Sequence, residues 1–177
     1  MRDISLHILD IAENSINAGA KNISIKIMEE IKKNLLTVEI TDDGKGMNKE
    51  FAENAVSPFV TTRTTRKIGL GLPLLKAAAE IANGKFAIKS ATGKGTKITA
   101  VFQLNHVDRK PVGSMAKTIL SLAANNPETN IKYIRKQNGK KFMFDSGIFG
   151  KITDEDDFDV STRLLDIKKY LKENSII

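Results

Sequence analysis

ITDDGKGM, at residues 40–47, is the end of a strand pattern that runs into a glycine-rich loop. Leu35–Thr41 alternates apolar and polar side chains, and Asn22–Glu29 alternates in the same way upstream. Alternation with a period of two is typical of a strand with one buried face. With the short connection at residues 30–34, these patterns predict a hairpin whose second strand leads directly into the loop.

Residues 3–18, before the hairpin, predict a helix that Gly19 would stop. Its apolar side chains recur at helical spacing and form one face: Ile4, Ile8, Ile11, Ala12 and Ile16. Polar side chains three and four positions apart form a stripe: His7, Asp10, Asn14 and Asn17. Solvated helix faces usually carry lysine and glutamate, whereas short carboxylates and amides suit contact with a ligand. A stripe that only faces solvent is the alternative at this point.

The chain after the loop predicts two further helices and a second pair of strands. Asn48 is a suitable N-cap for a short helix over residues 48–56. A polar segment rich in threonine and arginine follows, without an apolar period. The remaining expected elements are a helix over Gly69–Ala82 and strands over Lys85–Ser90 and Lys97–Leu104, joined by a turn at Thr92–Gly95.

The pattern changes after Leu104, and we expect a domain at residues 1–105 followed by a C-terminal extension at residues 106–177. The extension would form a small subdomain or a surface for docking a partner. Its expected elements are a linker at Arg109–Pro111, a helix over Val112–Ala124, a hairpin of strands Ile131–Arg135 and Lys141–Asp145 around Asn138-Gly139, and a last helix over Ser161–Glu173.

The composition of the 177 residues fits one folded domain with an extension and excludes several classes of site. The absence of cysteine excludes disulfides, thiolate metal sites and cysteine nucleophiles. No apolar run approaches the ~18 residues of a membrane span, so we expect a cytoplasmic protein without membrane contact. The net charge of +7 divides into +4 over residues 1–105 and +3 over the rest. This even spread, with two tyrosines and no tryptophan, disfavours nucleic-acid binding.

Five motifs occur in a fixed order along residues 1–104. They are DIAENSINAGA at Asp10–Ala20, the loop Asp42-x-Gly44-x-Gly46, the run from Pro58 to Arg63, the turn Gly69-Leu70-Gly71-Leu72-Pro73, and Gly93-Lys94-Gly95-Thr96. Each motif alone is weak, but the succession resembles the GHKL ATPases, which include gyrase, a heat-shock chaperone, histidine kinases and MutL. The resemblance implies an α/β two-layer sandwich, with a mixed and mostly antiparallel sheet and helices on one face. It also implies ATP and Mg²⁺ as cofactors.

The same resemblance assigns residues to the nucleotide. Asn14 would ligate Mg²⁺ through its amide oxygen, and Asp42 would accept a hydrogen bond from the adenine amino group. Glycines at the start of a helix would offer their amides to phosphate oxygens. The further nucleotide contacts that it implies are Asn17, Gly44, Gly46, Met47, Gly69, Leu70, Gly71, Leu72 and Thr96. Phe59 is a further implied contact. A short ATP lid over residues 61–67, for which a solvated basic loop is the alternative, would add Thr62, Arg63 and Lys67, with Arg63, Arg66 or Lys67 near the phosphates.

Asp10 is the expected catalytic residue. It precedes Asn14 by four positions, where MutL, gyrase and the anti-sigma-factor kinases have a glutamate general base. A carboxylate there favours proton removal from a hydroxyl or a water, but aspartate is one methylene shorter than glutamate. The alternative is a carboxylate that only orders water or His7. The histidine itself is expected to be structural, because a phospho-acceptor histidine would lie on a separate helical hairpin and we expect none before this domain.

Two functions remain open at this point. The first is an ATP-dependent kinase of a partner protein, or a slow ATPase, similar to the stand-alone anti-sigma-factor kinases. The second is a non-catalytic module whose affinity for a partner changes with bound ATP. ATP or ADP, a regulatory protein and a second copy of the chain are the expected partners, and a nucleic-acid binder in the manner of MutL is disfavoured.

Overall fold

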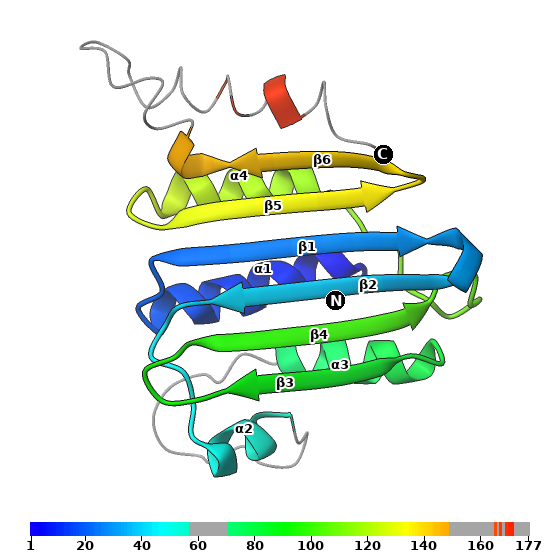
Figure 1. Cartoon of the computed structure of the whole chain (residues 1–177), viewed down its shortest axis with the longest axis horizontal. Coiled ribbons are helices and arrows are strands. Elements are labelled where there is room, and N and C mark those ends of the chain that lie inside the picture. Colours follow the sequence, from blue (N-terminus) through cyan, green and yellow to red (C-terminus); the bar gives the residue numbers. More distant parts are fainter. Residues whose placement is uncertain (57–70, 149–164, 166, 168, 172–177) are drawn as a thin grey trace.

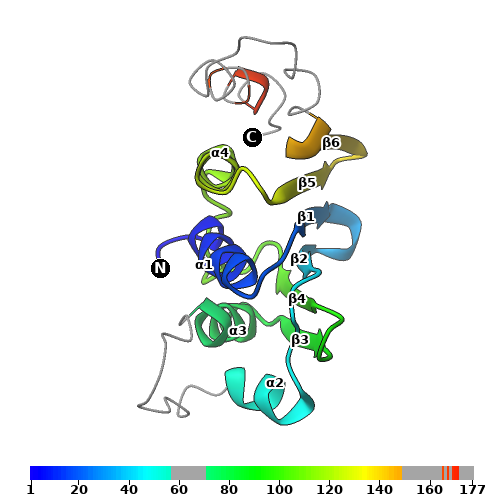
Figure 2. The same ribbon diagram turned by 90° about the vertical axis from the view of Figure 1, so that its left-hand side faces the viewer.

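The computed structural model describes residues 1–56, 71–148, 165, 167 and 169–171, which form a six-stranded sheet with helices on one face. Figure 2 shows α1, α3 and α4 side by side against the sheet, and α2 beyond its lower edge. The helices are α1 (Ile4–Asn17), α2 (Lys49–Ala55), α3 (Gly71–Ile81) and α4 (Met115–Asn125), with a 3₁₀ turn, η1 (Ile31–Lys33). The strands are β1 (Asn22–Glu30), β2 (Leu35–Asp42), β3 (Lys85–Ser90), β4 (Thr96–Gln103), β5 (Asn130–Gln137) and β6 (Lys140–Asp145).

The strand order is β3-β4-β2-β1-β5-β6 (Figure 1). Neighbouring strands are antiparallel except β1 and β5, which are parallel and in register from Asn22 opposite Asn130 to Glu29 opposite Gln137. The expected two-layer sandwich with a mixed, mostly antiparallel sheet is therefore confirmed. The two strands of the C-terminal extension continue the sheet of the preceding residues.

The core lies between the sheet and the three helices. Alternate strand residues such as Ile23, Ile25 and Ile27 are fully or almost fully buried, and Ile4 and Ile8 of α1 pack against that face. Burying one such side chain contributes about 1.5–3 kcal/mol, so the amphipathic patterns of strand and helix are sufficient reason for the two layers to associate.

The linker before α4 differs from the sequence-based expectation. Helix α4 begins at Met115, three residues later than expected, with the Ser114 side chain as its N-cap. Residues 111 and 112 contact α1 instead: their carbonyl oxygens accept hydrogen bonds from the amides of Ile4 and Ser5 at 3.0 and 2.8 Å. The linker thus caps the first turn of α1, whose amides have no partner within the helix.

Most other expected elements agree with the structure within one or two residues, including α2 with its Asn48 cap. The last expected helix, 161–173, lies mostly outside the described residues; within it, Ile167 and Leu171 are buried. Among the helices that the structure describes, none has the length and apolarity needed to cross a membrane.

Candidate functional site

Asp42, at the end of β2, is a buried carboxylate that joins the sheet to α1. The Ser15 hydroxyl donates to its Oδ2 at 2.7 Å, and the backbone amide of Gly44 donates to its Oδ1 at 3.0 Å. Only 8% of the residue is exposed, and no ion pair reaches it from the described part of the chain. The carboxylate is therefore held in one orientation with lone pairs still available for another donor.

The loop after Asp42 packs against the turn between β3 and β4. The Gly93 amide donates to the Lys45 carbonyl oxygen at 2.7 Å. A Cβ on residue 46, where φ is +64°, would lie 2.0 Å from the Ala91 carbonyl oxygen. Glycine is therefore required at Gly46 for the two loops to approach each other, in addition to any role beside a ligand.

A small hydroxyl cluster connects these loops. The Ser90 hydroxyl accepts from the Met47 amide at 2.8 Å and donates to the Gly95 carbonyl oxygen at 2.9 Å. It also lies 2.9 Å from the hydroxyl of Thr96, which is itself buried. Met47 and Thr96, two of the expected nucleotide contacts, are thus held together with the end of the Asp42 loop.

Asp10 and Asn14, on the polar stripe of α1, face the start of α3. The Gly71 amide donates to Asp10 Oδ2 at 2.9 Å, and Asn14 Nδ2 lies 3.5 Å from the same oxygen. A Cβ on residue 71 would come within 2.2 Å of that oxygen, so any other residue there would require the Asp10 side chain to shift. The first α3 amide that the structure describes thus has a protein carboxylate as its acceptor.

His7 occupies the buried end of the same stripe. The residue is fully buried, and neither ring nitrogen has a hydrogen-bond partner among the described residues. Burial lowers the pKa of His7 to about 4, and the positive charges of Lys110 and the N-terminus act in the same direction. A neutral, inaccessible imidazole fits the structural role expected from the sequence.

The donor set suits a hard cation that a phosphate chain also binds. Mg²⁺ prefers oxygen ligands and takes one or two of them from protein side chains. Asn14 supplies an amide group and Asp10 a half-buried carboxylate within one turn of α1. The described residues contain no cluster of three or more His, Cys, Asp or Glu side chains that could hold a metal ion.

The remaining expected nucleotide contacts lie in different environments. Asn17 is exposed at the end of α1, and Gly44 is buried beside Ala18. Leu72 belongs to the hydrophobic core, where it packs against other apolar side chains. Six expected nucleotide contacts lie outside the described residues: Phe59, Thr62, Arg63, Lys67, Gly69 and Leu70.

Three polar residues of this region were not predicted from the sequence to belong to the site. Ser15 and Ser90 make the contacts described above, and Asp43 accepts from the amides of Lys21 and Asn22 at 2.8 and 2.9 Å. Ser15 had a detectable signal, since a serine one position after Asn14 falls toward the apolar face of the helix. The other two depend on segments that only the folded chain brings together.

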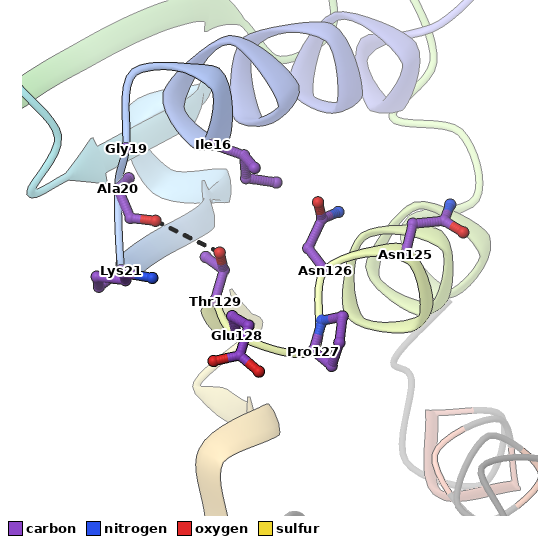
Figure 3. Close-up of a pocket in the computed structure, with 9 residues that line it drawn as sticks. All are labelled: Ile16, Gly19, Ala20, Lys21, Asn125, Asn126, Pro127, Glu128 and Thr129. Carbon is purple, nitrogen blue, oxygen red and sulfur yellow. Dashed lines mark hydrogen bonds between the residues drawn. The ribbon is translucent and has the colours of Figure 1, made fainter.

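A pocket of about 290 Å³ opens between the end of α1 and the turn after α4 (Figure 3). Its lining includes Ile16, Lys21, Asn126, Glu128 and Thr129, and Thr129 donates to the Ala20 carbonyl oxygen at 3.4 Å. None of the expected site residues lines it. The pocket is therefore separate from the polar stripe and from the Asp42 loop.

Comparison with known proteins begins with a family model. The family of histidine kinase-, DNA gyrase B- and HSP90-like ATPases matches residues 2–106. Sensor histidine kinase YvrG of Bacillus subtilis is 30% identical over 94 residues, which are 51% of this chain and 16% of that protein. The non-motile and phage-resistance protein of Caulobacter vibrioides is 27% identical over 118 residues, 62% of this chain and 14% of that protein. Each alignment thus spans about a sixth or less of the relative.

Two solved structures share the fold. The N-terminal domain of a DNA repair protein has a TM-score of 0.57 at 18% identity, covering 81% of this chain and 52% of its own. The MutL ATPase domain of Aquifex aeolicus complexed with ADP has a TM-score of 0.52 at 14% identity, covering 96% and 70%. The second alignment extends into the C-terminal residues that the family model does not reach.

Proposed function

The chain belongs to the family of histidine kinase-, DNA gyrase B- and HSP90-like ATPases, and we propose that it binds ATP between α1, the Asp42 loop and the start of α3. Asp42 carries this proposal. A buried carboxylate, oriented by Ser15 and Gly44 and without a cationic partner in the described residues, is suited to accept a hydrogen bond from an adenine amino group. The loop glycines and Thr96 would then lie around the base.

Magnesium fits the α1 stripe, with Asn14 as the protein ligand. Bound there, the ion would neutralise charge on the phosphate oxygens. Asn14 would hold the ion through its amide oxygen while Asp10 accepts from the Asn14 amide nitrogen. The amide of Gly71, at the N-terminal end of α3, would turn from Asp10 to a phosphate oxygen when the nucleotide enters.

We further propose that Asp10 acts as a proton acceptor, so that the protein transfers the γ-phosphate to a partner protein or slowly to water. Its Oδ2 is the acceptor of the Gly71 amide, and no hydrogen bond from the described residues reaches Oδ1. An oxygen free to accept a proton from a hydroxyl or water is what general-base catalysis requires. The proposed setting is the cytoplasm, with a regulatory protein as the acceptor and a second copy of the chain as a further partner.

A non-catalytic ATP-responsive module is the second candidate, and the contact between Asp10 and Gly71 favours it. One carboxylate oxygen already serves a structural purpose at the start of α3. Displacement of that contact by a nucleotide would shift α3 and change the surface offered to a partner without any transfer of phosphate.

Calorimetric titration tests the binding site. Asn14→Ala should weaken Mg·ATP binding at least about tenfold and affect metal-free ADP much less, because it removes the proposed ion ligand. Asp42→Asn should weaken both, because it removes one acceptor of the adenine contact. Asp108→Asn, which makes the same charge change as Asp42→Asn but in an exposed turn, is the control. Unchanged affinity in both site variants would refute the assignment.

Phosphate release separates the two candidate functions. With [γ-³²P]ATP as the probe, the wild-type chain should release phosphate slowly, and Asp10→Asn should abolish that release while retaining ATP binding. Asp108→Asn again serves as the control. Equal release by the wild type and Asp10→Asn, together with tight ATP binding and no transfer of label to a candidate partner protein, would instead support the non-catalytic module.

A further inference from the structure

The described helices α1, α3 and α4 cover one face of the sheet (Figure 2), and the face that no described helix covers is turned to the viewer in Figure 1. Strand residues that alternate with the buried ones project from this open face. In the six described strands its charged side chains comprise seven lysines and three carboxylates: Lys26, Lys85, Lys89, Lys97, Lys132, Lys136, Lys141, Glu30, Glu39 and Asp145. The open face thus carries a net positive charge of +4 out of the chain's +7.

Part of this charge is neutralised within the sheet. Lys26 and Lys97 both contact Glu39, at 2.8 and 2.6 Å, and Lys132 lies 3.9 Å from Asp145. The other four lysines of the open face have no ion pair with any described residue. Lys85, Lys89 and Lys141 lie on the outermost strands β3 and β6, and Lys136 lies on β5 opposite Lys141, so the uncompensated charge is concentrated toward both edges of the face.

Two cross-strand pairs on the open face are of like charge. Lys136 is directly opposite Lys141, and Lys89 is directly opposite Lys97. Like charges at directly opposed positions destabilise a sheet. An acidic partner on this face would remove that repulsion, so the arrangement is electrostatically complementary to a negative surface.

An apolar group lies between the lysines on the β1–β5–β6 side. Ile134 is directly opposite Met143, and Met28 is one pair further along the sheet, opposite Lys136. Met143 is 42% exposed. Protein interfaces combine an apolar centre with a polar rim, and methionine adapts to varied partner surfaces.

We propose that the open face docks a protein that presents an acidic rim around an apolar centre. This docking is independent of the proposed nucleotide site, which lies at the ends of the strands and on the helical side. The described strands place no arginine and no aromatic side chain on the open face. It therefore lacks the stacking platforms and guanidinium forks that nucleic-acid surfaces use. A second copy of the chain would bring lysines against lysines.

The test measures binding of three fluorescent probes to the full chain at 0.15 M salt: a poly(Glu,Tyr) copolymer, poly-Glu and a 20-base-pair DNA duplex. We expect the copolymer to bind most tightly because it offers both carboxylates and apolar rings. Lys136→Glu with Lys141→Glu should weaken it at least about tenfold. Lys32→Glu with Lys117→Glu, the same charge change on exposed residues elsewhere, should alter it less than about twofold.

Met143→Ser separates the apolar centre from the charge. This variant should weaken binding of the copolymer several-fold and leave the affinity for poly-Glu unchanged. Equal losses in the two double variants would overturn the proposal, because the attraction would then depend on net charge alone. Tighter binding of DNA than of the copolymer would overturn it in favour of a nucleic acid. Stronger copolymer binding after the acidic residues of 154–159 are replaced by amides would assign the face to the chain's own acidic stretch.

Discussion

Two helix–strand units, α1–β1 and α4–β5, lie next to each other in this protein and run in the same direction. Their helices pack side by side on the same face of the sheet (Figure 2), and their strands form the one parallel pair among the strands that the structure describes. They differ in what the helix buries. Helix α1 buries three polar side chains, Ser5, His7 and Ser15, whereas α4 buries one, Thr118.

The difference shows how one architecture can serve two purposes. In α1 a buried hydroxyl reaches a carboxylate at the end of a neighbouring strand, and the stripe beyond it faces α3. In α4 the Thr118 hydroxyl only contacts the Ser5 carbonyl oxygen of α1, at 3.4 Å. The second unit therefore supports the first, and the chemistry depends on which polar side chains a helix carries.

Removal of the supporting unit should have the largest effect. A chain shortened to residues 1–106 would lose the eight-residue pairing of β1 with β5 and the caps on Ile4 and Ser5. It would also expose the side of α1 that packs on α4. We expect a loss of more than about 5 kcal/mol, comparable to the whole stability of many domains. Far-ultraviolet circular dichroism during urea titration measures it, and cooperative unfolding with full ATP affinity would contradict the supporting role.

His7 should make α1 sensitive to acid in a way that α4 is not. The pKa of His7 is about 4 in the folded chain against 6.5 as the ordinary value, so between these pH values the unfolded chain takes up a proton that the folded chain does not. Stability contributed by the neutral imidazole is complete above pH 6.5 and falls as the pH drops toward 4. Between pH 7 and 4.5 the loss should be about 2–3 kcal/mol.

The variant His7→Leu isolates this effect, because other groups also titrate over that range. The free energy of unfolding, measured in urea at pH 7 and 4.5, should depend less on pH in His7→Leu than in the wild type. His106→Gln, which alters the histidine in the turn after β4, is the matched control for the loss of an imidazole outside α1. The same pH dependence in all three chains would show that His7 is not the titrating group.

Ser15→Ala and Thr118→Ala should have the smallest effects on stability but should give the most selective comparison of the two helices. Each removes one buried hydroxyl from one of the two neighbouring helices, at a cost of about 1–2 kcal/mol. Only Ser15 contacts Asp42, so only Ser15→Ala should also weaken the binding of ATP, by about tenfold. Urea unfolding and calorimetric titration measure the two quantities. Equal ATP affinity in both variants would separate Ser15 from the nucleotide site.

Much of the fold could be predicted, since its elements follow local patterns. The period of two in β1 and β2 and the helical spacing of isoleucines in α1 both reflect which side chains face the core. The late start of α4 could not be predicted from such patterns. The carbonyl oxygens of residues 111 and 112 accept from the amides of Ile4 and Ser5, more than 100 positions away. No local sequence pattern near residue 112 predicts that contact.

The candidate site divides in the same way. Asp10, Asn14 and Asp42 could be selected from the sequence because each belongs to a motif. In the structure Asp42 is buried, and Asp10 and Asn14 are neighbours. The assignment of these residues to ATP and magnesium stays a prediction. The support that Ser90 gives the loops could not be predicted, because it joins the neighbouring Gly95 and Thr96 to Met47, which lies 43 positions away in the chain.

The sequence by itself determined the strands, the helices and the glycine turns, since these depend on side-chain size, polarity and backbone freedom within a few residues. Only the tertiary structure decided that β5 lies beside β1, that the Gly71 amide meets Asp10, and that seven lysines share one uncovered face. Such contacts join segments far apart along the chain. Their free energy depends on the whole packed arrangement, which no local pattern records.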